Sequence, residues 1–513
     1  MAIHSDLSLR GDLSPKQSQI DCHDLTSNPP NDSDFCHTEA IAEVSQRKKR
    51  VIITLKDITE RGGGERVGAN LANAFARELG YEVQVLSFFR ANATPCYALD
   101  SSVKCTYLRN RPAKAKNALV MLFNKTLLRV ILCYQVHKIA KRINADIILA
   151  NDGWFVPLFA QKKRVLSKNA KLVRLWHINA PKRARKKLRL FDTLVVLSPR
   201  EIALWQRYHH NIAVIPNFLP QIPNKSTNHA QKVVLSVGRM DKGDQKGFLR
   251  LLDIWKIVQE SIKNPLSKDC ATTSSLRESA SADSWQSTLQ ESKMDCREFD
   301  KSNSRNDTKP CHTEPLGEVS QNEVSLEKDN RDISGFALNM TKIDSVAFSK
   351  SQYNKADLDA LKEWKLVIVG DGIMKSQIES KINDLGLQDS IILKPFTKEI
   401  EKEYLSASVY AMSSHWEGFP MVLLEACSYG LPCIAFDIAT GPSDIIKHSK
   451  SGFLISDDDL EAYANHLLKL MSDESMRINF GIEAKRIVGE RFSKEVIMEK
   501  WEEVFRELLK FLD

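Results

Sequence analysis

The 513-residue sequence lacks three features that would place the chain in a special class of protein. None of its 10 cysteines forms a Cys-x-x-Cys pair and several lie in apolar runs, so a disulfide framework is not indicated. The first residues contain no apolar stretch of the kind that a secretory signal peptide has. The most hydrophobic window, residues 119–134, is too short to cross a bilayer and contains Lys125 and Arg129. We therefore expect a cytoplasmic protein.

Positive charge is in modest excess and unevenly distributed. The formal net charge is +8, and the basic runs at 162–164 and 182–189 (KRARKKLR) both lie in the first half of the chain. Basic clusters attract phosphates, acidic lipid headgroups or nucleic acid, although a lysine-rich face can also simply be solvated. No aromatic residues alternate with KRARKKLR as they do where bases stack on a protein, so a nucleic-acid partner is not expected.

Two long segments have the composition of unfolded chain. Residues 1–48 and 264–356 are rich in Ser, Asp and Asn and show no apolar periodicity, so we predict a disordered tail and a low-complexity insert. They share a repeat, NDSDFCHTEAIAEVSQ at 31–46 and NDTKPCHTEPLGEVSQ at 306–321, whose role the sequence leaves open. The adjacent Cys-His pairs of this repeat lack the usual spacing of zinc ligands, so no metal site is expected.

The remaining sequence alternates short apolar runs with amphipathic stretches, which is the pattern of a parallel sheet covered by helices. The pattern begins at residue 49, restarts after residue 222 and ends in an amphipathic helix at 494–513. We therefore predict an α/β protein with two tandem Rossmann-like domains, 49–222 and 223–263 with 357–493, and a ligand cleft between them. The predicted strands are 51–55, 81–88, 145–152, 170–178, 192–198, 232–239, 364–372, 390–396, 408–414 and 432–437, and the predicted helices include 68–79, 246–262 and 496–512.

The stretch EGFPMVLLEA places Glu417 just before a predicted helix and Glu425 inside it. Pro420 suits the first position of a helix, and a Gly-x-Pro sequence at the other end is a stop signal, so the helix is predicted at about 420–429. The two glutamates are eight residues apart, or about 80° around a helix, so they do not form a ladder on one face.

The start of this helix is predicted to bind an anion. Backbone amides from Met421 and Val422 onward would point into the crevice at the end of the preceding strand, where the helix dipole favours negative charge. Carboxylates accept hydrogen bonds from hydroxyl groups, so the two glutamates would flank a phosphate that has hydroxylated rings on both sides, as in a nucleotide sugar. The alternative is an ordinary solvated helix start, where acidic residues favour the dipole.

Cations that would complete such a site lie in SVGRMDKGDQKG. Arg239 follows a predicted strand, and Lys246 precedes a predicted helix. A guanidinium and an ammonium that converge there would neutralise a diphosphate without a metal ion. Lys242 is a rival for the second position, and the alternative for these cations is a place on a solvated loop.

The ordered succession of these motifs resembles the family-4 glycosyltransferases of GT-B fold, whose hallmark is E-x7-E, here Glu417 and Glu425. The resemblance extends over much of residues 49–510 apart from the insert. It includes GGGER (62–66), His177, Pro-Asn at 216–217, SVGR, VGDG (369–372), EGFP and GPSDII (441–446). It implies a retaining transfer of a hexose or N-acetylhexosamine from a nucleotide sugar, usually UDP-linked, with no essential metal and no other cofactor.

The resemblance also implies roles for individual residues. Arg239 and Lys246 match the family's diphosphate-binding pair, although their spacing is longer than in many relatives. Glu425 matches the residue that holds the ribose hydroxyls, Glu417 the one that faces the donor sugar, and His177 a catalytic position near that sugar. The other donor-binding positions are Gly63, Gly64, Asn217 and the phosphate-lining segment Phe419, Pro420, Met421 and Val422. A plain strand-to-helix turn is the alternative for the two glycines, and a structural histidine is the alternative for His177.

In this fold the first domain binds the acceptor. The basic residues of 162–189 and the amphipathic stretch 119–142 fit contact with an anionic membrane that carries a lipid-linked glycan, at the inner face of the plasma membrane. The second-domain motifs most resemble those of bacterial enzymes that assemble lipopolysaccharide, capsule or lipid-linked oligosaccharides. Two alternatives stay open, a nucleotide-sugar epimerase or phosphorylase of the same fold and a non-catalytic membrane-surface binding protein.

Overall fold

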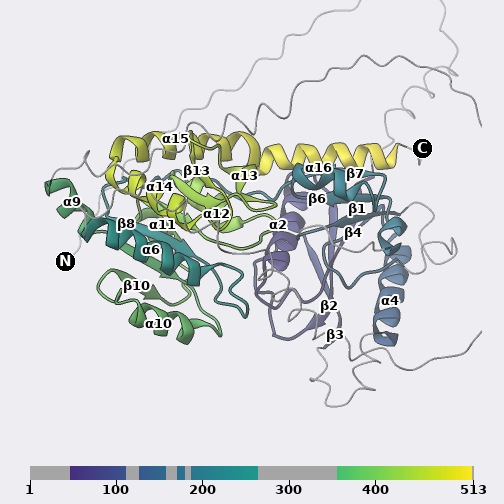
Figure 1. Ribbon diagram of the computed structural model, residues 1–513. Coiled ribbons are helices and arrows are strands. Elements are labelled where there is room, and N and C mark those ends of the chain that lie inside the picture. Colours follow the sequence, from purple (N-terminus) through teal and green to yellow (C-terminus); the bar gives the residue numbers. More distant parts are fainter. Residues whose placement is uncertain (1–46, 111–125, 158–169, 179–185, 264–354, 511–513) are drawn as a thin grey trace, which may run out of the picture. The chain divides into compact units, whose positions relative to one another are not determined.

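The computed structural model describes residues 47–110, 126–157, 170–178, 186–263 and 355–510 (Figure 1). Residues 50–513 form one compact unit. The predicted tail at 1–48 and the predicted insert at 264–356 lie almost wholly outside the described residues. The basic run at 162–164 and the first half of KRARKKLR lie outside them as well.

The first sheet has seven parallel strands in the order β3-β2-β1-β4-β5-β6-β7 (Figure 1). The strands are β1 (Arg50–Leu55), β2 (Glu82–Arg90), β3 (Lys104–Asn110), β4 (Ile147–Ala150), β5 (Lys171–Leu175), β6 (Thr193–Val196) and β7 (Ile212–Val214). The central strand β1 pairs with both β2 and β4, so that Val51 lies opposite Val83 on one side and Ile147 on the other. All four residues of β4 are buried, as expected for a parallel strand covered on both faces.

The helices of the first domain have apolar residues at helical spacing. In α2 (Gly63–Arg77), Val67, Leu71 and Phe75 are buried, one on each successive turn. In α4 (Leu127–Ile143), the buried residues include Leu128, Leu132, Val136 and Ala140, again four residues apart. The shorter elements are two 3-10 turns, Lys186–Leu190 and Pro199–Glu201, and the helix α5 (Ile202–Trp205).

The second sheet has six parallel strands in the order β10-β9-β8-β11-β12-β13. The strands are β8 (Val233–Val237), β9 (Lys365–Val369), β10 (Ile391–Lys394), β11 (Val409–Met412), β12 (Cys433–Phe436) and β13 (Gly452–Ile455). The helices are α6 (Phe248–Lys263), α9 (Lys355–Lys362), α10 (Lys375–Asp384), α11 (Ile400–Leu405), α12 (Met421–Ser428), α13 (Pro442–Ile445), α14 (Leu460–Ser472), α15 (Glu474–Phe492) and α16 (Lys494–Leu509).

Both sheets place their first strand between their second and fourth strands in chain order. Each sheet therefore has a switch point at which the loops after two neighbouring strands diverge and leave a crevice, the usual ligand site of doubly wound folds. The first crevice lies after β1 and β4, and the second lies after β8 and β11. The prediction of two tandem Rossmann-like domains is confirmed.

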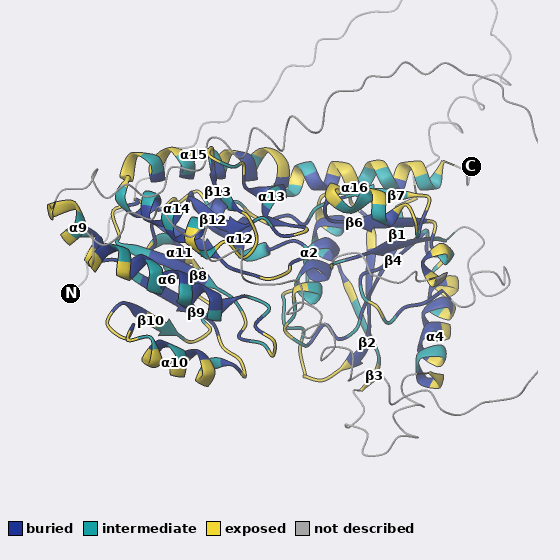
Figure 2. Ribbon diagram, in the orientation of Figure 1, coloured by how far each residue is buried: buried dark blue, intermediate teal, exposed yellow. Residues whose placement is uncertain are grey.

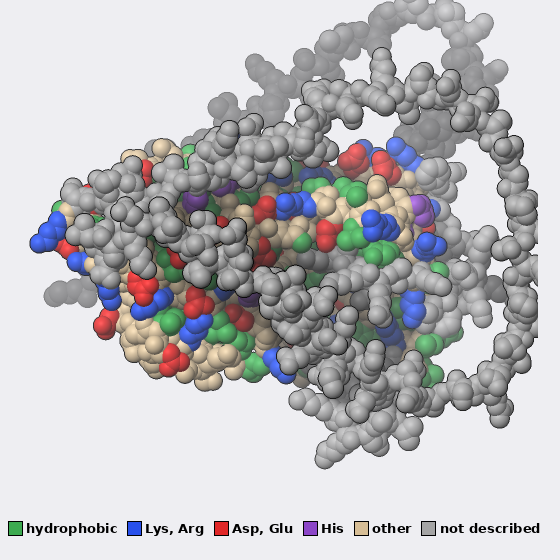
Figure 3. Space-filling view, in the orientation of Figure 1, with side chains coloured by type: hydrophobic (Ala, Val, Ile, Leu, Met, Phe, Trp, Pro, Cys, Tyr) green, Lys and Arg blue, Asp and Glu red, His purple; other side chains and the backbone are tan. Residues whose placement is uncertain are grey.

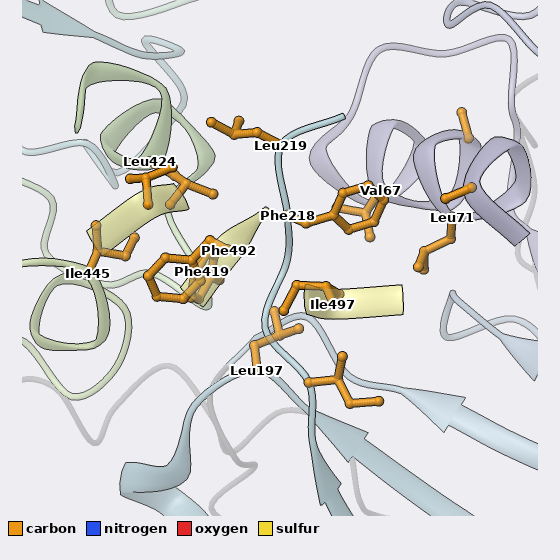
Figure 4. Packing of buried hydrophobic residues seen from close by; sticks show 14 of the residues in the cluster. Val67, Leu71, Leu197, Phe218, Leu219, Phe419, Leu424, Ile445, Phe492 and Ile497 are labelled. Carbon is orange, nitrogen blue, oxygen red and sulfur yellow. The ribbon is translucent and has the colours of Figure 1, made fainter. Parts of the chain in front are cut away.

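One apolar cluster contains residues of both domains and of the segments that join them. Phe218 and Leu219 follow β7, Phe419 precedes α12, and Phe492 and Ile497 lie at the junction of α15 and α16 (Figure 4). All five are buried, and the rings of Phe419 and Phe492 are 5.5 Å apart. Figure 2 shows the buried residues concentrated in the two sheets and on the inner faces of the helices. Burying apolar surface from both domains in one cluster stabilises their connection.

Three local predictions are corrected by the structure. Strands β3, β7 and β13 were not predicted, because β3 is only partly buried, β7 is three residues long and β13 is four. Pro420 is not the first helical residue but the extended residue that precedes α12, with φ −78° and ψ 96°. The Gly-rich turn is shorter than predicted, because Gly62 is extended while Gly63 and Gly64 already begin α2.

Candidate functional site

Glu417 lies in the loop between β11 and α12, where its side chain is buried. Its Oε1 accepts hydrogen bonds from Lys246 Nζ at 2.6 Å and from Ser414 Oγ at 2.7 Å. The side chains of this ion pair are 17 % exposed for Lys246 and 7 % for Glu417. Because a buried carboxylate is costly unless it is paired, this cation and hydroxyl are what allow Glu417 to stay ionised.

The backbone around Glu417 is packed tightly enough to fix the position of the loop. Thr440 Oγ1 donates to the backbone oxygen of Glu417 at 2.6 Å. Gly441 has a φ of 102°, and a Cβ atom there would lie 2.6 Å from Pro420 Cδ and 3.5 Å from Glu417 Cβ. Only glycine combines that backbone conformation with so close an approach. The GPSDII segment therefore supports the start of α12 from the side.

The two cations predicted to bind the diphosphate have different surroundings. Lys246 is held on Glu417, and its side-chain carbons pass Gly238, where a Cβ atom would lie 2.9 Å from Lys246 Cγ. Arg239 is 64 % exposed and pairs with Asp241 at 3.0 Å. Lys242, the rival cation, is exposed as well. The structure thus brings Lys246 into the buried part of the site and leaves Arg239 at its surface.

Glu425 lies in the second turn of α12, and its two carboxylate oxygens have different partners. Oε2 accepts a hydrogen bond from the Tyr404 hydroxyl at 3.0 Å, and Oε1 is bonded to the guanidinium of Arg66. Tyr404 is fully buried, and its burial together with the Glu425 charge raises its pKa well above the usual value. Burial alone would lower the pKa of Arg66, but the attraction of Glu425 outweighs it and the pKa is raised. Arg66 is therefore a permanent cation at this carboxylate.

His177 follows β5 and is held at the end of the first sheet by Asn151. Its Nε2 lies 2.9 Å from the backbone oxygen of Asn151 and 3.0 Å from Asn151 Oδ1, so Nε2 carries the proton and donates it. Asn151 in turn donates from Nδ2 to the backbone oxygen of Gly64 at 2.8 Å. Burial and the nearby Arg174 lower the pKa of His177 to about 4, so its imidazole is neutral near pH 7.

Glycines stand where the backbones of the two domains meet. A Cβ atom at Gly418 would lie 1.7 Å from the backbone oxygen of His177, so these two backbones are in direct contact. A Cβ atom at Gly64 would lie 4.0 Å from the His177 ring, and one at Gly63 would meet no atom within 4 Å. Packing within the protein therefore explains Gly418 but not Gly63, which leaves open space beside the first turn of α2.

The remaining predicted positions are split between backbone and core. Phe419 is buried with its ring against Phe492, so only its backbone faces the site. The amides of Met421 and Val422 are in the first turn of α12, where N–H groups have no partner within the helix. Asn217 is buried in the connection between β7 and β8.

Several residues of the site were not predicted. Arg66 stands in the quoted GGGER motif, which is the only sequence signal that pointed to it. Tyr404 and Ser414 have no local signal, because a tyrosine on one helix and a serine after a strand are common in any fold. Arg200 was also missed, and it joins the two domains through Asp437 at 2.5 Å and Ser443 at 2.7 Å.

A pocket opens beside this contact between the domains. It is lined by residues after β5 and β6 of the first domain and by two residues of the second, namely Trp176, His177, Ile178, Val196, Leu197, Ser198, Glu201, Trp205, Gly418 and Thr440. Among the described residues, no group of three or more His, Cys, Asp or Glu side chains is placed to hold a metal ion. None of the helices in the described part of the chain is long and apolar enough to span a bilayer.

Comparisons with known proteins agree with this architecture. The fold has two doubly wound domains of GT-B type, and solved glycosyltransferases share it: the TarM enzyme of Staphylococcus aureus aligns over 89 % of this chain and 99 % of its own, with a TM-score of 0.56 at 15 % identity. The model "Glycosyltransferase Family 4" matches residues 61–220, and "Glycosyl transferases group 1" matches residues 347–487. The chain belongs to the family-4 glycosyltransferases of GT-B fold.

Three relatives show how far the similarity extends. An exopolysaccharide phosphotransferase of Streptomyces coelicolor is 39 % identical over 151 residues, which are 29 % of this chain and 16 % of that protein. The amylovoran biosynthesis glycosyltransferase AmsD of Erwinia amylovora is 39 % identical over 141 residues, 28 % of this chain and 39 % of the relative. A glycosyltransferase of Haemophilus influenzae is 22 % identical over 88 % of this chain and 99 % of its own length. The chain thus spans well under half of the two relatives with the higher identity.

Proposed function

We propose that the protein is a retaining glycosyltransferase that moves a hexose or N-acetylhexosamine from a nucleotide sugar to a lipid-linked or cell-surface glycan. The observation that carries this proposal is the arrangement of Glu417 and Glu425 at the start of α12, each buried and each paired with a cation. Such carboxylates can accept hydrogen bonds from the hydroxyls of a sugar and a ribose on either side of a phosphate at the helix N-terminus.

The donor is proposed to be UDP-linked. The TarM structure named above was solved in complex with UDP and α-GlcNAc-glycerol, and a pneumococcal O-GlcNAc transferase that aligns over 90 % of this chain at 14 % identity was solved with UDP and GlcNAc. These are properties of those proteins, and they support a uridine nucleotide as the first candidate here. No metal ion or other cofactor is proposed, because Arg239, Lys246 and the α12 amides would neutralise the diphosphate.

The proposed reaction exchanges one bond at the anomeric carbon for another on the same face of the sugar. The bond from the anomeric carbon to the β-phosphate oxygen breaks, and a bond to the acceptor hydroxyl oxygen forms. The acceptor proton passes to the departing phosphate, so no protein nucleophile or base is required. Charge that grows on the β-phosphate would be stabilised by Lys246, whose ammonium has donors besides the one on Glu417, by Arg239 and by the amides of Met421 and Val422.

The acceptor side is proposed to lie on an anionic membrane at the inner face of the plasma membrane. On α4, Leu127, Ile131 and Tyr134 are 51 %, 40 % and 47 % exposed, and their spacing puts them on one face of the helix. Lys138 and Lys141 continue this exposed face toward the helix C-terminus. Figure 3 shows hydrophobic and cationic side chains together in this part of the molecule. An apolar stripe followed by lysines suits a helix that lies in the headgroup region.

The proposal is tested by mixing the purified protein with UDP-, GDP-, ADP- and CMP-sugars and following melting temperature and nucleotide release. A donor at a hundred times its Kd should stabilise the protein by about 2.7 kcal/mol. Glu425→Gln should abolish the shift, whereas Glu503→Gln, an exposed glutamate of α16, should keep it. If no nucleotide sugar of the panel stabilises the protein, the transferase proposal is wrong.

The alternative functions would give different results in the same assay. An epimerase would convert the nucleotide sugar without any acceptor, and a phosphorylase would need inorganic phosphate. A membrane-surface binding protein would neither bind nor turn over a donor. The relatives named above do not favour these alternatives.

A further inference from the structure

The carboxylate of Glu425 is shared between the two domains. Tyr404, which holds Oε2, belongs to the second domain, is fully buried and stacks on Tyr429 with ring centroids 5.3 Å apart. Arg66, which holds Oε1, belongs to the first domain and is separated from Glu425 by 359 residues of chain. The orientation of Glu425 is thus set by one fixed partner from its own domain and one partner from the other.

Arg66 is well anchored at its own end. It lies in the first turn of α2, and its N–H donates to the backbone oxygen of Gly62 at 3.0 Å. The Tyr97 hydroxyl donates to the same oxygen at 3.3 Å. The Gly-rich turn therefore fixes where Arg66 starts, and its side chain, 34 % exposed, reaches from there to Glu425. One edge of the guanidinium remains open to solvent.

An ionised carboxylate offers about four lone-pair positions, of which Arg66 and Tyr404 occupy two. Two positions remain for donors from a ligand, and a ribose presents two neighbouring hydroxyls. A guanidinium is a planar fork that orients a carboxylate better than an ammonium does. Without it, Glu425 could rotate about its last bond and lose the alignment with both hydroxyls.

We propose that Arg66 is a positioning residue of the donor site, which turns the Glu425 carboxylate toward the ribose hydroxyls of the nucleotide. Recognition of the ribose then depends on a residue of the domain that does not itself bind the ribose. The inference rests on the proposed nucleotide-sugar donor and adds to it a residue outside the E-x7-E motif.

A second cross-domain ion pair provides a matched control. Arg200 of the first domain pairs with Asp437 of the second at 2.5 Å, and their side chains are 42 % and 28 % exposed. This pair also ties the domains together, but neither partner touches Glu425 in the contacts described above. If Arg66 only held the domains together, removing Arg200 should have the same consequence as removing Arg66.

The test compares the affinity of the full-length protein for UDP and for 2′-deoxy-UDP by calorimetry. Wild type should prefer UDP by about tenfold or more, because a hydrogen bond to a charged group is lost with the 2′-hydroxyl. Arg66→Gln should reduce this preference to near one, as Glu425→Gln should. Arg200→Gln should retain the wild-type preference, and Arg66→Lys should restore part of it, since it returns the charge without the fork.

Other results would overturn the inference. If Arg66→Gln weakens UDP and 2′-deoxy-UDP equally, Arg66 contributes only general charge or domain contact. If Arg200→Gln removes the preference as well, contact between the domains alone accounts for the effect. If wild type binds UDP without preferring it to the deoxy compound, Glu425 does not read the ribose and the inference is wrong. A wild-type protein that binds no nucleotide of the wider panel would instead contradict the proposed donor itself.

Discussion

Charged side chains of the candidate site are buried in pairs, and this governs what single substitutions do. Glu417 and Glu425 are 6 % and 9 % exposed, and Lys246 and Arg66 are their cationic partners. Removing one partner of a buried pair leaves a charge without compensation, which is more harmful than removing both. Variants that keep the shape but remove the charge, such as glutamine for glutamate, are therefore the cleaner probes of function.

Gly418 is the position at which the smallest change should have a large effect. Alanine there would place Cβ 1.7 Å from the His177 backbone oxygen, so Gly418→Ala must separate the two backbones. We expect a loss of about 1 to 3 kcal/mol of stability and a strong loss of transfer activity. Thermal unfolding and nucleotide release measure both. Gly153→Ala is the control, because a Cβ atom there meets nothing within 4 Å, and an equal loss in both variants would contradict the assignment.

His177 should make stability depend on pH. Burial and Arg174 lower its folded-state pKa to about 4, whereas the unfolded value is about 6.5. The unfolded state therefore binds the proton first, so the contribution of His177 to stability is lost as the pH falls from about 6.5 to about 4. The full effect would be up to about 3 kcal/mol, reduced because the ring is partly exposed.

Urea unfolding of wild type and His177→Gln at several pH values measures this effect. The difference in the free energy of unfolding between the two proteins should shift in favour of the variant as the pH drops from 7 to 4.5. The comparison with the variant is needed because His137, whose pKa burial also lowers to about 4, contributes a similar dependence to both proteins. A difference that stays constant with pH would show that His177 is not held neutral.

Residue identities of the site were predicted unevenly. Glu417, Glu425 and Lys246 were singled out from the motifs in which they stand, and the structure buries all three side chains in the same domain. Arg239 was predicted beside Lys246 but is largely exposed and paired with Asp241. Arg66 was not predicted to contact Glu425, because no local pattern relates two residues 359 positions apart.

At the scale of elements, amphipathic pattern and burial agree for most helices and strands. The predicted helix at 246–262 is α6 (Phe248–Lys263), and the predicted strand at 364–372 is β9 (Lys365–Val369). Strand β3, by contrast, has no buried residue, so its sequence carries no apolar signal and its pairing with β2 defines it instead. Sequence pattern thus locates elements that face the core and misses an edge strand that only extends it.

Helix α4 should determine membrane binding if the proposal for its exposed face is right. Leu127→Asp with Ile131→Asp places two charges where the apolar stripe would enter the headgroup region. We expect wild type to co-float with vesicles that contain phosphatidylglycerol and to bind phosphatidylcholine vesicles far less. The double variant should bind the anionic vesicles about tenfold less well or weaker, since each lost apolar contact and each added charge disfavours the surface.

The matched control for α4 is Ile482→Asp on α15, because Ile482 is 65 % exposed and lies on the second domain. It should bind vesicles as wild type does. If the α4 variant floats normally, α4 does not face lipid. If it floats normally but wild type alone is a dimer in light scattering, the stripe contacts a second copy of the chain instead.

At the scale of the whole molecule, the last helix belongs to the first domain by packing although it ends the second by sequence. Trp501 and Phe505 of α16 lie 5.5 Å and 5.3 Å from the ring of Phe75 on α2. All three side chains are buried. The start of α16, capped by Ser493, follows α15 directly, so this helix connects the packing of the two domains.

Trp501→Ala should therefore weaken the first domain selectively. A buried tryptophan replaced by alanine costs about 3 to 5 kcal/mol, and the cavity would lie against α2. Hydrogen exchange should quicken in α2 (Gly63–Arg77) while α6 (Phe248–Lys263) stays protected. Glu507→Ala, an exposed residue of the same helix, is the control. Faster exchange in α6 to the same extent would mean that α16 supports both domains equally.

The sequence by itself determined where most strands and helices lie, that they alternate, and that Glu417 and Glu425 flank the start of a helix. These properties depend on residues close together in the chain, whose spacing reflects which side faces a core. Only the tertiary structure decided which charges meet. Lys246 reaches Glu417, and Arg66 reaches Glu425 from the other domain, because the carboxyl ends of strands in both sheets bring distant loops together. Such contacts leave no periodic trace in the sequence, since each needs one residue of the right charge and no pattern around it.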